Sequence, residues 1–260
     1  MKLHFKKYQG TGNDFIIIDN RQNLYDLLDV AYLCHPKFGI GGDGLMLLQN
    51  KAGYDFEMVY YNSDGNISSM CGNGGRCIVD FAKRLGVFEG HSTKFLAADG
   101  PHEAIWEDDF VELKMQDVSK IERRGKDYVL NTGSPHYVVF ANAIDTMEIV
   151  DEASLIRYNA EFSAEGINVN FVELMDESNQ ILVRTYERGV EDETLSCGTG
   201  VTASAIAMSE YVEVADGDYT IGIQTPGGNL VVKYSKANGV YTNVWLCGPA
   251  TEVFTGEIDL

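Results

Sequence analysis

The chain has 260 residues, of which 45% are hydrophobic, and this length allows a large core in one or two domains. Its 39 acidic residues outnumber 20 basic ones and give a formal charge of −19, which argues against binding to nucleic acid or to an anionic membrane surface. Five cysteines are an odd number, so a disulfide framework is not expected in a chain of this size.

The N-terminal residues 1–7 lack the apolar segment of a signal peptide, and no apolar run approaches the about 20 residues of a membrane span. We therefore expect a cytoplasmic protein with reduced thiols. Short runs rich in β-branched and aromatic residues predict strands over 15–19, 45–49, 56–61, 111–115, 137–140, 169–174, 181–186, 230–234 and 244–246. Helices are predicted over 22–33, 73–86, 151–159 and 199–212.

The order of these elements indicates an internal repeat. A glycine-containing turn that leads into an apolar strand occurs at residues 10–18 and again at 133–140. In each half a strand ending in polar residues precedes a Cys-Gly segment and a helix, at an offset of about 125 residues. We infer two similar β-rich halves, residues 1–117 and 118–251, with the tail at 252–260 returning to the first half as a strand.

Two cysteines open the most informative segments, CGNG at 71–74 and CGTG at 197–200. A cysteine at a helix N-terminus lies beside unpaired N–H groups in the positive end of the helix dipole, which lowers its thiol pKa. The same N–H groups can hold a carboxylate. Two such sites facing each other would bind one amino-acid carboxylate and flank its α-carbon with two sulfurs. The alternative is a duplication for packing alone, with Cys71 and Cys197 as small buried hydrophobic residues.

The other motifs in the sequence indicate less about function. Residues 39–44 match G-x-G-x-x-G, but a dinucleotide site needs a strand before and a helix after. Here Pro36 precedes and the strand-like residues 45–48 follow, so a tight turn is the better interpretation. The scattered histidines and the absence of C-x-x-C favour neither a metal site nor a redox dithiol. The remaining cysteines are expected in the core: Cys34, Cys77 and Cys247.

Polar residues cluster around the two cysteines at loop or strand ends in equivalent parts of the repeat. They are Asn13, Asn62, Asn73, Asn168, Glu187 and Arg188. Taken singly, each is typical of a turn or a surface pair. As a set facing a cleft they would suit a zwitterionic ligand, because amides and an arginine bind carboxylate and a carboxylate binds ammonium.

Over nearly its whole length the chain resembles the diaminopimelate epimerase family. The motifs that carry the resemblance are GTGNDFIIID (10–19), YNSDGNISSMCGNGGRC (61–77), GSPHYV (133–138), INVNFV (167–172), YERGVEDETLSCGTG (186–200), PGGNL (226–230) and GPATEVFTGEI (248–258). The resemblance implies an α+β fold of two similar β-barrel-like domains, each around a central helix, related by a pseudo-two-fold axis with the site between them. It also implies a homodimer that epimerises LL-2,6-diaminopimelate to the meso isomer without a cofactor, in lysine and cell-wall precursor biosynthesis.

The resemblance further implies roles for single residues. Cys71 and Cys197 would be the two acid/base residues, with His136 near the first and Glu187 near the second to set thiol protonation. Backbone groups at the two helix starts would hold the reacting carboxylate: Gly72, Asn73, Gly74, Gly198 and Thr199. The other substrate-binding residues, which include those that read the distal amino-acid end, would be Asn13, Asn62, Ser134, Asn168, Glu187 and Arg188.

Two positions depart from the family pattern. Ser134 stands where many members have Asn, which implies a shorter or water-mediated contact to the distal carboxylate. Between Glu187 and Cys197 there is one more residue than in many members, since Glu191-Asp192 replaces a single Gly. Three alternatives stay open: a racemase or epimerase of proline or another amino acid, a thiol redox or sensor protein, and a non-catalytic amino-acid binder.

Overall fold

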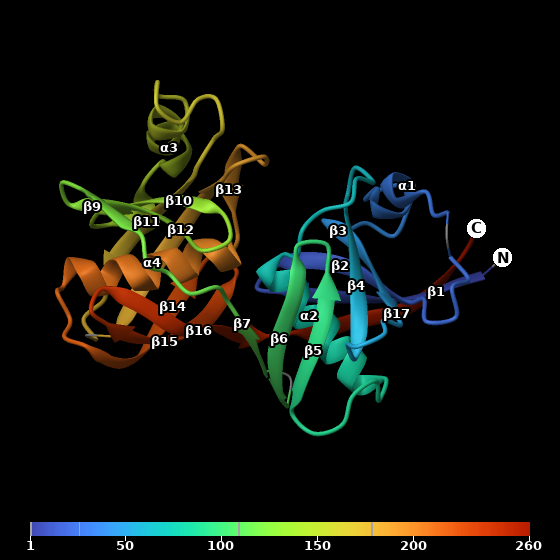
Figure 1. The fold of residues 1–260 in the computed structure, drawn as a ribbon. Coiled ribbons are helices and arrows are strands. Elements are labelled where there is room, and N and C mark those ends of the chain that lie inside the picture. Colours follow the sequence, from blue (N-terminus) through green and yellow to red (C-terminus); the bar gives the residue numbers. More distant parts are fainter. Residues whose placement is uncertain (1, 26, 109, 178) are drawn as a thin grey trace. The chain divides into compact units, whose positions relative to one another are not determined.

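The computed structural model describes residues 2–25, 27–108, 110–177 and 179–260. The chain forms two compact units, Met1–Leu113 with Gly248–Leu260 (unit 1) and Lys114–Cys247 (unit 2), and both consist mostly of strands (Figure 1). The helices are α1 (Val30–Cys34), α2 (Gly72–Arg84), α3 (Ile149–Arg157) and α4 (Gly198–Tyr211), with a 3-10 turn η1 (Ile144–Thr146).

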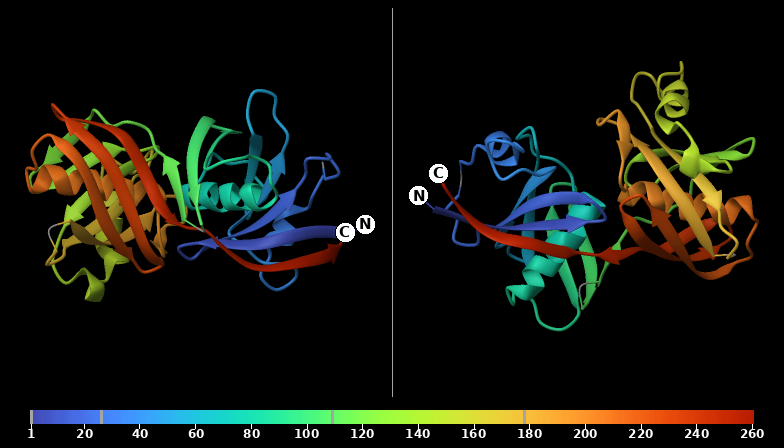
Figure 2. Two further views of the ribbon diagram at one scale, coloured as in Figure 1. Left: turned by 90° about the horizontal axis from the view of Figure 1, so that it is seen from below. Right: turned by 180° about the vertical axis from the view of Figure 1, so that it is seen from behind.

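The strands of unit 1 are β1 (Lys2–Gly10), β2 (Asn13–Asp19), β3 (Gly44–Gln49), β4 (Phe56–Asn62), β5 (Ser92–Ala97), β6 (Gly100–Glu107), β7 (Phe110–Lys114) and β17 (Thr251–Asp259). They lie in the order β17-β1-β2-β3-β4-β5-β6-β7. The first eleven residues of α2 are all buried, so this helix is the centre of the unit and the sheet wraps around it (Figure 2).

The strands of unit 2 are β8 (Ile121–Arg124), β9 (Asp127–Asn131), β10 (Pro135–Phe140), β11 (Asn168–Leu174), β12 (Gln180–Glu187), β13 (Asp192–Thr194), β14 (Gly217–Thr225), β15 (Gly228–Ala237) and β16 (Val240–Pro249). Helix α4 is buried from Gly200 to Ser209 and is the centre of this unit. Two of its hydroxyl groups bond within the helix: Thr202 Oγ1 donates to Gly198 O at 2.9 Å and Ser204 Oγ to Gly200 O at 2.8 Å.

Strand pairing confirms the internal repeat. In unit 1 the successive pairs from β1 to β7 are antiparallel, parallel, antiparallel, parallel, antiparallel and antiparallel. The pairs β9–β10, β10–β11, β11–β12, β12–β14, β14–β15 and β15–β16 of unit 2 follow the same series. Each unit also places its central helix between the fourth and fifth strands of this series. The elements that carry Cys71 and Cys197 are therefore equivalent by topology.

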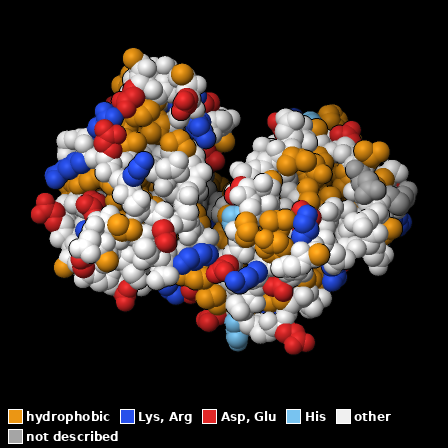
Figure 3. Space-filling model, viewed as in Figure 1, with side chains coloured by type: hydrophobic (Ala, Val, Ile, Leu, Met, Phe, Trp, Pro, Cys, Tyr) orange, Lys and Arg blue, Asp and Glu red, His pale blue; other side chains and the backbone are white. Residues whose placement is uncertain are grey.

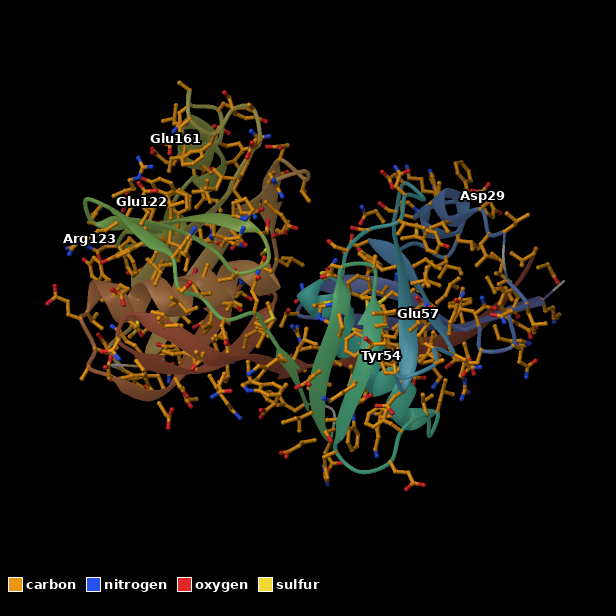
Figure 4. All side chains as sticks on the ribbon, viewed as in Figure 1. Asp29, Tyr54, Glu57, Glu122, Arg123 and Glu161 are labelled. Carbon is orange, nitrogen blue, oxygen red and sulfur yellow. The ribbon has the colours of Figure 1, made fainter. Side chains whose placement is uncertain are left out.

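The predicted helix over 22–33 is wrong for most of its length. Only α1 at Val30–Cys34 is helical, and residue 26 lies outside the described residues. Asn20 Oδ1 accepts hydrogen bonds from the N–H groups of Leu24 (2.9 Å) and Tyr25 (3.0 Å), which holds this segment in a turn. Asp29, marked in Figure 4, then caps the short helix by accepting from Tyr32 N at 3.0 Å.

The other helix predictions agree with α2, α3 and α4 to within a few residues at each end. The strands that were not predicted carry polar residues on one face. In β1, for example, lysines and a histidine alternate with the buried Leu3, Phe5 and Tyr8. Residues 251–259 form β17, which pairs antiparallel with β1 from Lys2↔Asp259 to Gln9↔Thr251.

Acidic and basic side chains are scattered over the face seen in Figure 3 and do not gather into one basic patch. Within the described ranges, none of the helices combines the length and the apolar character that crossing a bilayer requires. Among the same residues no group of three or more His, Cys, Asp or Glu side chains is placed to hold a metal ion.

Candidate active site

In unit 1, Cys71 occupies the N-cap position of the central helix. Its backbone is extended (φ −99°, ψ 133°), and α2 begins with the next residue. Gly75 N donates to Cys71 O at 2.7 Å, which is the first hydrogen bond of the helix. In an α-helix the N–H groups of the first turn lack an acceptor within the helix, and such groups can bind an anion.

Close approach of β1 lets the helix start here. A Cβ on Gly10 of β1 would lie 3.1 Å from Asn73 O and 3.3 Å from Cys77 Sγ. Both distances are tighter than ordinary contacts, so glycine allows the strand to pack against the first turn of α2. Cys77 itself is fully buried, as expected for a core residue, and burial raises the pKa of its thiol.

An amide network faces the Cys71 sulfur. Asn13 Oδ1 lies 3.6 Å from Cys71 Sγ, and Asn13 Nδ2 donates to Asp43 Oδ2 at 2.5 Å. The carboxylate of Asp43 also accepts from Asp14 N at 3.1 Å. Because a carboxylate only accepts, the NH₂ of Asn13 must face Asp43 and its oxygen must face the sulfur.

Arg76 supports this network from inside the helix. Its side chain is fully buried, and it donates to Asn73 Oδ1 at 3.0 Å, to Gly72 O at 3.2 Å and to Thr11 Oγ1 at 3.3 Å. The amide of Asn73 is thereby oriented so that Nδ2 donates to Asn13 Oδ1 at 3.5 Å. The sequence prediction missed Arg76, although an arginine within the mostly apolar run after CGNGG was a possible signal.

In unit 2, Cys197 occupies the equivalent N-cap position. Its backbone is extended (φ −116°, ψ 113°), and Val201 N donates to Cys197 O at 2.9 Å. The residue is 8% exposed, whereas Cys71 is more open to solvent. Cys197 Sγ lies 3.5 Å from Thr199 Oγ1 in the first turn of α4.

A buried histidine contacts the same threonine. His136 of β10 is completely buried, and its Nε2 lies 2.9 Å from Thr199 Oγ1. Its Nδ1 faces Asn170 Nδ2 at 3.0 Å. Burial, with a smaller contribution from the positive charge of Arg188, lowers the pKa of His136 to about 3. The imidazole is therefore neutral at neutral pH.

A second cluster in unit 2 joins three predicted residues. Asn168 Nδ2 donates to Ser134 Oγ at 2.9 Å and to Pro135 O at 3.0 Å, while its Oδ1 accepts from Arg188 N at 2.8 Å. The side chain of Arg188 is exposed, and one of its nitrogens donates to Glu165 O at 3.0 Å. A guanidinium has five donors, so this arrangement can also bind a carboxylate.

Two predicted residues stand at strand ends. Glu187 ends β12, and its Oε2 accepts from Thr194 Oγ1 at 3.1 Å, on the segment that leads into Cys197. Asn62 ends β4 with an exposed side chain, and its backbone closes a turn with Gly65 N and Asn66 O at 2.9 Å each. Both positions are consistent with ligand contacts from loop ends.

The comparisons of the sequence with known proteins point to one family, over nearly the whole chain. Residues 5–121 and 128–251 match the family model described as diaminopimelate epimerase. The protein named diaminopimelate epimerase in Flavobacterium psychrophilum is 49% identical over 262 residues, covering 99% of this chain and all of that protein. The chain belongs to the diaminopimelate epimerase family. Its relative of that name in Chlorobaculum tepidum is 39% identical over 261 residues and covers 96% of this chain and 99% of that protein.

Solved structures confirm the fold class predicted from the resemblance to the diaminopimelate epimerase family. A PhzF-family phenazine biosynthesis protein from Bacillus anthracis superposes over the whole of both chains with a TM-score of 0.74 at 14% identity. A probable proline racemase from Agrobacterium radiobacter covers 99% of this chain and 93% of its own, with a TM-score of 0.68 at 14% identity. At such identities the likeness concerns the fold alone.

The structure groups the predicted residues within each unit. Asn13, Cys71 and Asn73 lie together in unit 1. Unit 2 holds one group of His136, Thr199 and Cys197 and another of Ser134, Asn168 and Arg188. Sequence reasoning missed Asp43 and Asn170, which orient Asn13 and His136. Asn170 did leave a signal, since Asn168 and Asn170 alternate in a strand whose other inward residues are apolar.

Proposed function

We propose that this member of the diaminopimelate epimerase family converts LL-2,6-diaminopimelate to the meso isomer without a cofactor, with Cys71 and Cys197 as its acid/base pair. One observation carries the proposal: both cysteines are N-caps of topologically equivalent central helices. Packing alone does not explain two glycine-lined helix starts, since glycine is costly in regular structure and useful where a ligand approaches the backbone.

Inversion of a carbon needs two groups. One cysteine, as thiolate, removes the α-proton from one face, and the other, as thiol, delivers a proton to the opposite face. The sulfur that was a thiolate ends as a thiol and its partner ends as a thiolate, so the proton count balances. In the reverse reaction the two roles are exchanged.

The reacting carboxylate must take up negative charge as the α-proton leaves. We assign its binding to the backbone N–H groups at the two helix starts, from Gly72, Asn73, Gly74, Gly198 and Thr199. A preorganised donor of this kind contributes roughly 3–4 kcal/mol to transition-state stabilisation. The fixed backbone of the N-caps supports this assignment, because the donors need no reorganisation as charge develops.

The distal amino-acid end needs a carboxylate binder and an ammonium binder. We assign them to Arg188 and Glu187, with Asn13, Asn62, Ser134 and Asn168 as further contacts. The bonds from Asn168 to Ser134 Oγ and to Arg188 N support this assignment, because they fix the backbone from which the guanidinium extends. We also keep His136 and Glu187 as residues that set the protonation of the two thiols.

The test is isotope incorporation from LL-diaminopimelate in D₂O. The wild type should form the meso isomer with deuterium at one α-carbon, with no cofactor added. Cys71→Ser and Cys197→Ser should each lose epimerisation by at least about 10²-fold, the usual contribution of a positioned acid or base. Cys34→Ser is the matched control, because Cys34 is a buried cysteine in the core of unit 1. Retained epimerisation in either active-site variant would contradict the proposal.

We also propose a cytoplasmic homodimer. The mechanism needs one thiolate and one thiol, so the enzyme must work where cysteines stay reduced. Light scattering coupled to size exclusion should give twice the chain mass of 28.8 kDa. A monomer at micromolar concentration would refute the dimer and leave the chemistry untouched.

A further inference from the structure

We propose that Thr199 is a positioning residue that donates its hydroxyl hydrogen to Cys197 Sγ and so favours the thiolate form of Cys197, in an orientation imposed by His136 and Asn170. The proposal rests on the proposed epimerase function, in which Cys197 exchanges a proton with the substrate. It concerns the side chain of Thr199, whereas the binding of the substrate carboxylate was assigned to its backbone N–H.

The orientation of Asn170 is the first step. Its Nδ2 lies 3.4 Å from Tyr137 O, and its Oδ1 lies 3.0 Å from Thr185 Oγ1. A backbone carbonyl oxygen only accepts, so the NH₂ of Asn170 must face Tyr137 O. The hydroxyl of Thr185 then donates to Oδ1. The buried amide is fixed in one of its two possible orientations.

The tautomer of His136 follows from this orientation. The same NH₂ of Asn170 faces His136 Nδ1 at 3.0 Å, so Nδ1 accepts and carries no hydrogen. In a neutral imidazole the hydrogen is then on Nε2. His136 Nε2–H donates to Thr199 Oγ1 at 2.9 Å.

The hydroxyl of Thr199 therefore receives a hydrogen from one side and offers its own on the other. Its oxygen accepts from His136, which leaves its hydrogen to point at Cys197 Sγ, 3.5 Å away. A hydroxyl donor stabilises a thiolate more than a thiol, because hydrogen bonds to an ionised acceptor are about twice as strong. Asn170 thus donates to His136, His136 donates to Thr199, and Thr199 donates to the sulfur of Cys197.

The Cys71 half-site presents the opposite kind of atom. There the oxygen of Asn13 faces the sulfur at 3.6 Å, and an amide oxygen cannot donate. The charged side chains around it are Arg76, which binds Asn73, and Asp43, which binds Asn13. Because the atom that faces Cys71 Sγ here is an acceptor, whereas Thr199 Oγ1 carries a hydrogen, Cys71 serves as an internal reference for the effect.

The charged groups near Cys197 do not replace this donor. The titratable groups at its end of the unit are the neutral His136 and, at the end of β12, Glu187 and Arg188. Five other charged groups on the strands packed against α4 have partners elsewhere: Asp127 with Tyr137, Glu173 with the N–H groups of Ala143 and Ile144, Arg184 with Glu193, Asp218 with Ser235, and Lys236 with Glu210.

The test measures the thiolate directly in the absence of substrate. Iodoacetamide alkylation is followed against pH, and the labelled peptides containing Cys197 and Cys71 are quantified separately by mass spectrometry. Thr199→Val removes the hydroxyl at nearly constant shape, and Thr199→Ser keeps it. We expect Thr199→Val to raise the pH midpoint of Cys197 alkylation by about one unit, a tenfold loss of thiolate below the midpoint. Thr199→Ser should restore the midpoint, and that of Cys71 should not move.

The kinetic counterpart is the acid limb of kcat/KM for epimerisation. It should shift to higher pH in Thr199→Val and return in Thr199→Ser, with kcat affected more than KM. An unchanged Cys197 midpoint in Thr199→Val overturns the inference, even if activity falls. An equal shift of Cys71 overturns it too, since a general structural change would produce that result. These outcomes are independent of the isotope test above, which judges the two-cysteine function itself.

Discussion

The third residue after each cysteine offers a matched pair of substitutions with opposite expected effects on stability. A Cβ on Gly200 would lie 2.4 Å from Asn170 Oδ1 and 3.3 Å from Cys197 Cβ. A Cβ on Gly74, at the equivalent position of α2, would lie 3.3 Å from Met46 Sδ and 3.5 Å from Phe15 Cε1. A methionine side chain can yield by a few tenths of an ångström, whereas a buried, hydrogen-bonded amide cannot.

The magnitude for Gly200→Ala follows from the contacts of Asn170. If the amide moves, it gives up as many as three hydrogen bonds, to His136, Tyr137 and Thr185, at about 1 kcal/mol each. If it stays, overpacking costs about 1–3 kcal/mol. Replacing glycine by alanine in a helix stabilises the folded protein by up to about 1 kcal/mol through the higher helix propensity of alanine. We expect Gly200→Ala to lower the free energy of unfolding by about 2 kcal/mol.

Gly74→Ala has the same gain in helix propensity, and the nearest neighbour of the new methyl group is the flexible thioether of Met46. The free energy of unfolding of this variant should therefore equal that of the wild type or exceed it by up to about 1 kcal/mol. Urea unfolding followed by far-ultraviolet circular dichroism measures both variants. A Gly200→Ala protein as stable as the wild type would refute the reasoning. So would a Gly74→Ala protein destabilised to the same extent, because the argument depends on the difference between amide and thioether.

Three further predictions concern stability. Asp80→Asn should cost about 2–3 kcal/mol in urea unfolding, because the fully buried Asp80 accepts from Trp106 through Oδ1 and from Arg84 and Tyr8 through Oδ2, whereas an asparagine amide has only one accepting oxygen. Lys7→Met should cost about 1–3 kcal/mol in the same assay, since it removes the buried cation bound to the partly exposed Asp14 at 2.7 Å. His136→Gln should flatten the pH dependence of the free energy of unfolding. The reason is that histidine in the unfolded chain binds a proton below about pH 6.5, whereas the pKa of His136 in the folded protein is about 3. Between pH 7 and pH 5 the free energy of unfolding should therefore fall by about 2 kcal/mol more in the wild type than in the variant. An equal fall in both proteins would contradict this.

Much of the fold could be predicted because the repeat was visible in the spacing of glycines, apolar runs and Cys-Gly segments. Pattern reasoning failed where local chemistry decided. Asn20 holds residues 20–25 in a turn through its side chain, which hydrophobic periodicity does not register. Strand β1 was missed because its lysines alternate with core residues, and because the buried Lys7 binds Asp14 and Gly41 O, which lie outside the strand.

For the candidate site, the residues that contact the sulfurs or the helix starts were accessible from the sequence, but those that orient them were not. Asp43 and Asn170 act through Asn13 and His136, so their roles depend on which amide atom faces which neighbour. That information exists only once the strands are paired. The resemblance placed His136 near Cys71, whereas within its own unit it contacts Thr199, close to Cys197.

The pairing of β17 with β1 has a consequence for synthesis. The two ends of the chain meet in one sheet, with Lys2 opposite Asp259, and N and C lie together in Figure 1. Unit 2 is a single continuous stretch, but unit 1 contains residues that precede unit 2 and residues that follow it. During synthesis the edge of β1 that pairs with β17 therefore stays uncovered until residues 251–259 have been translated, and an uncovered strand edge favours mispairing with other nascent chains.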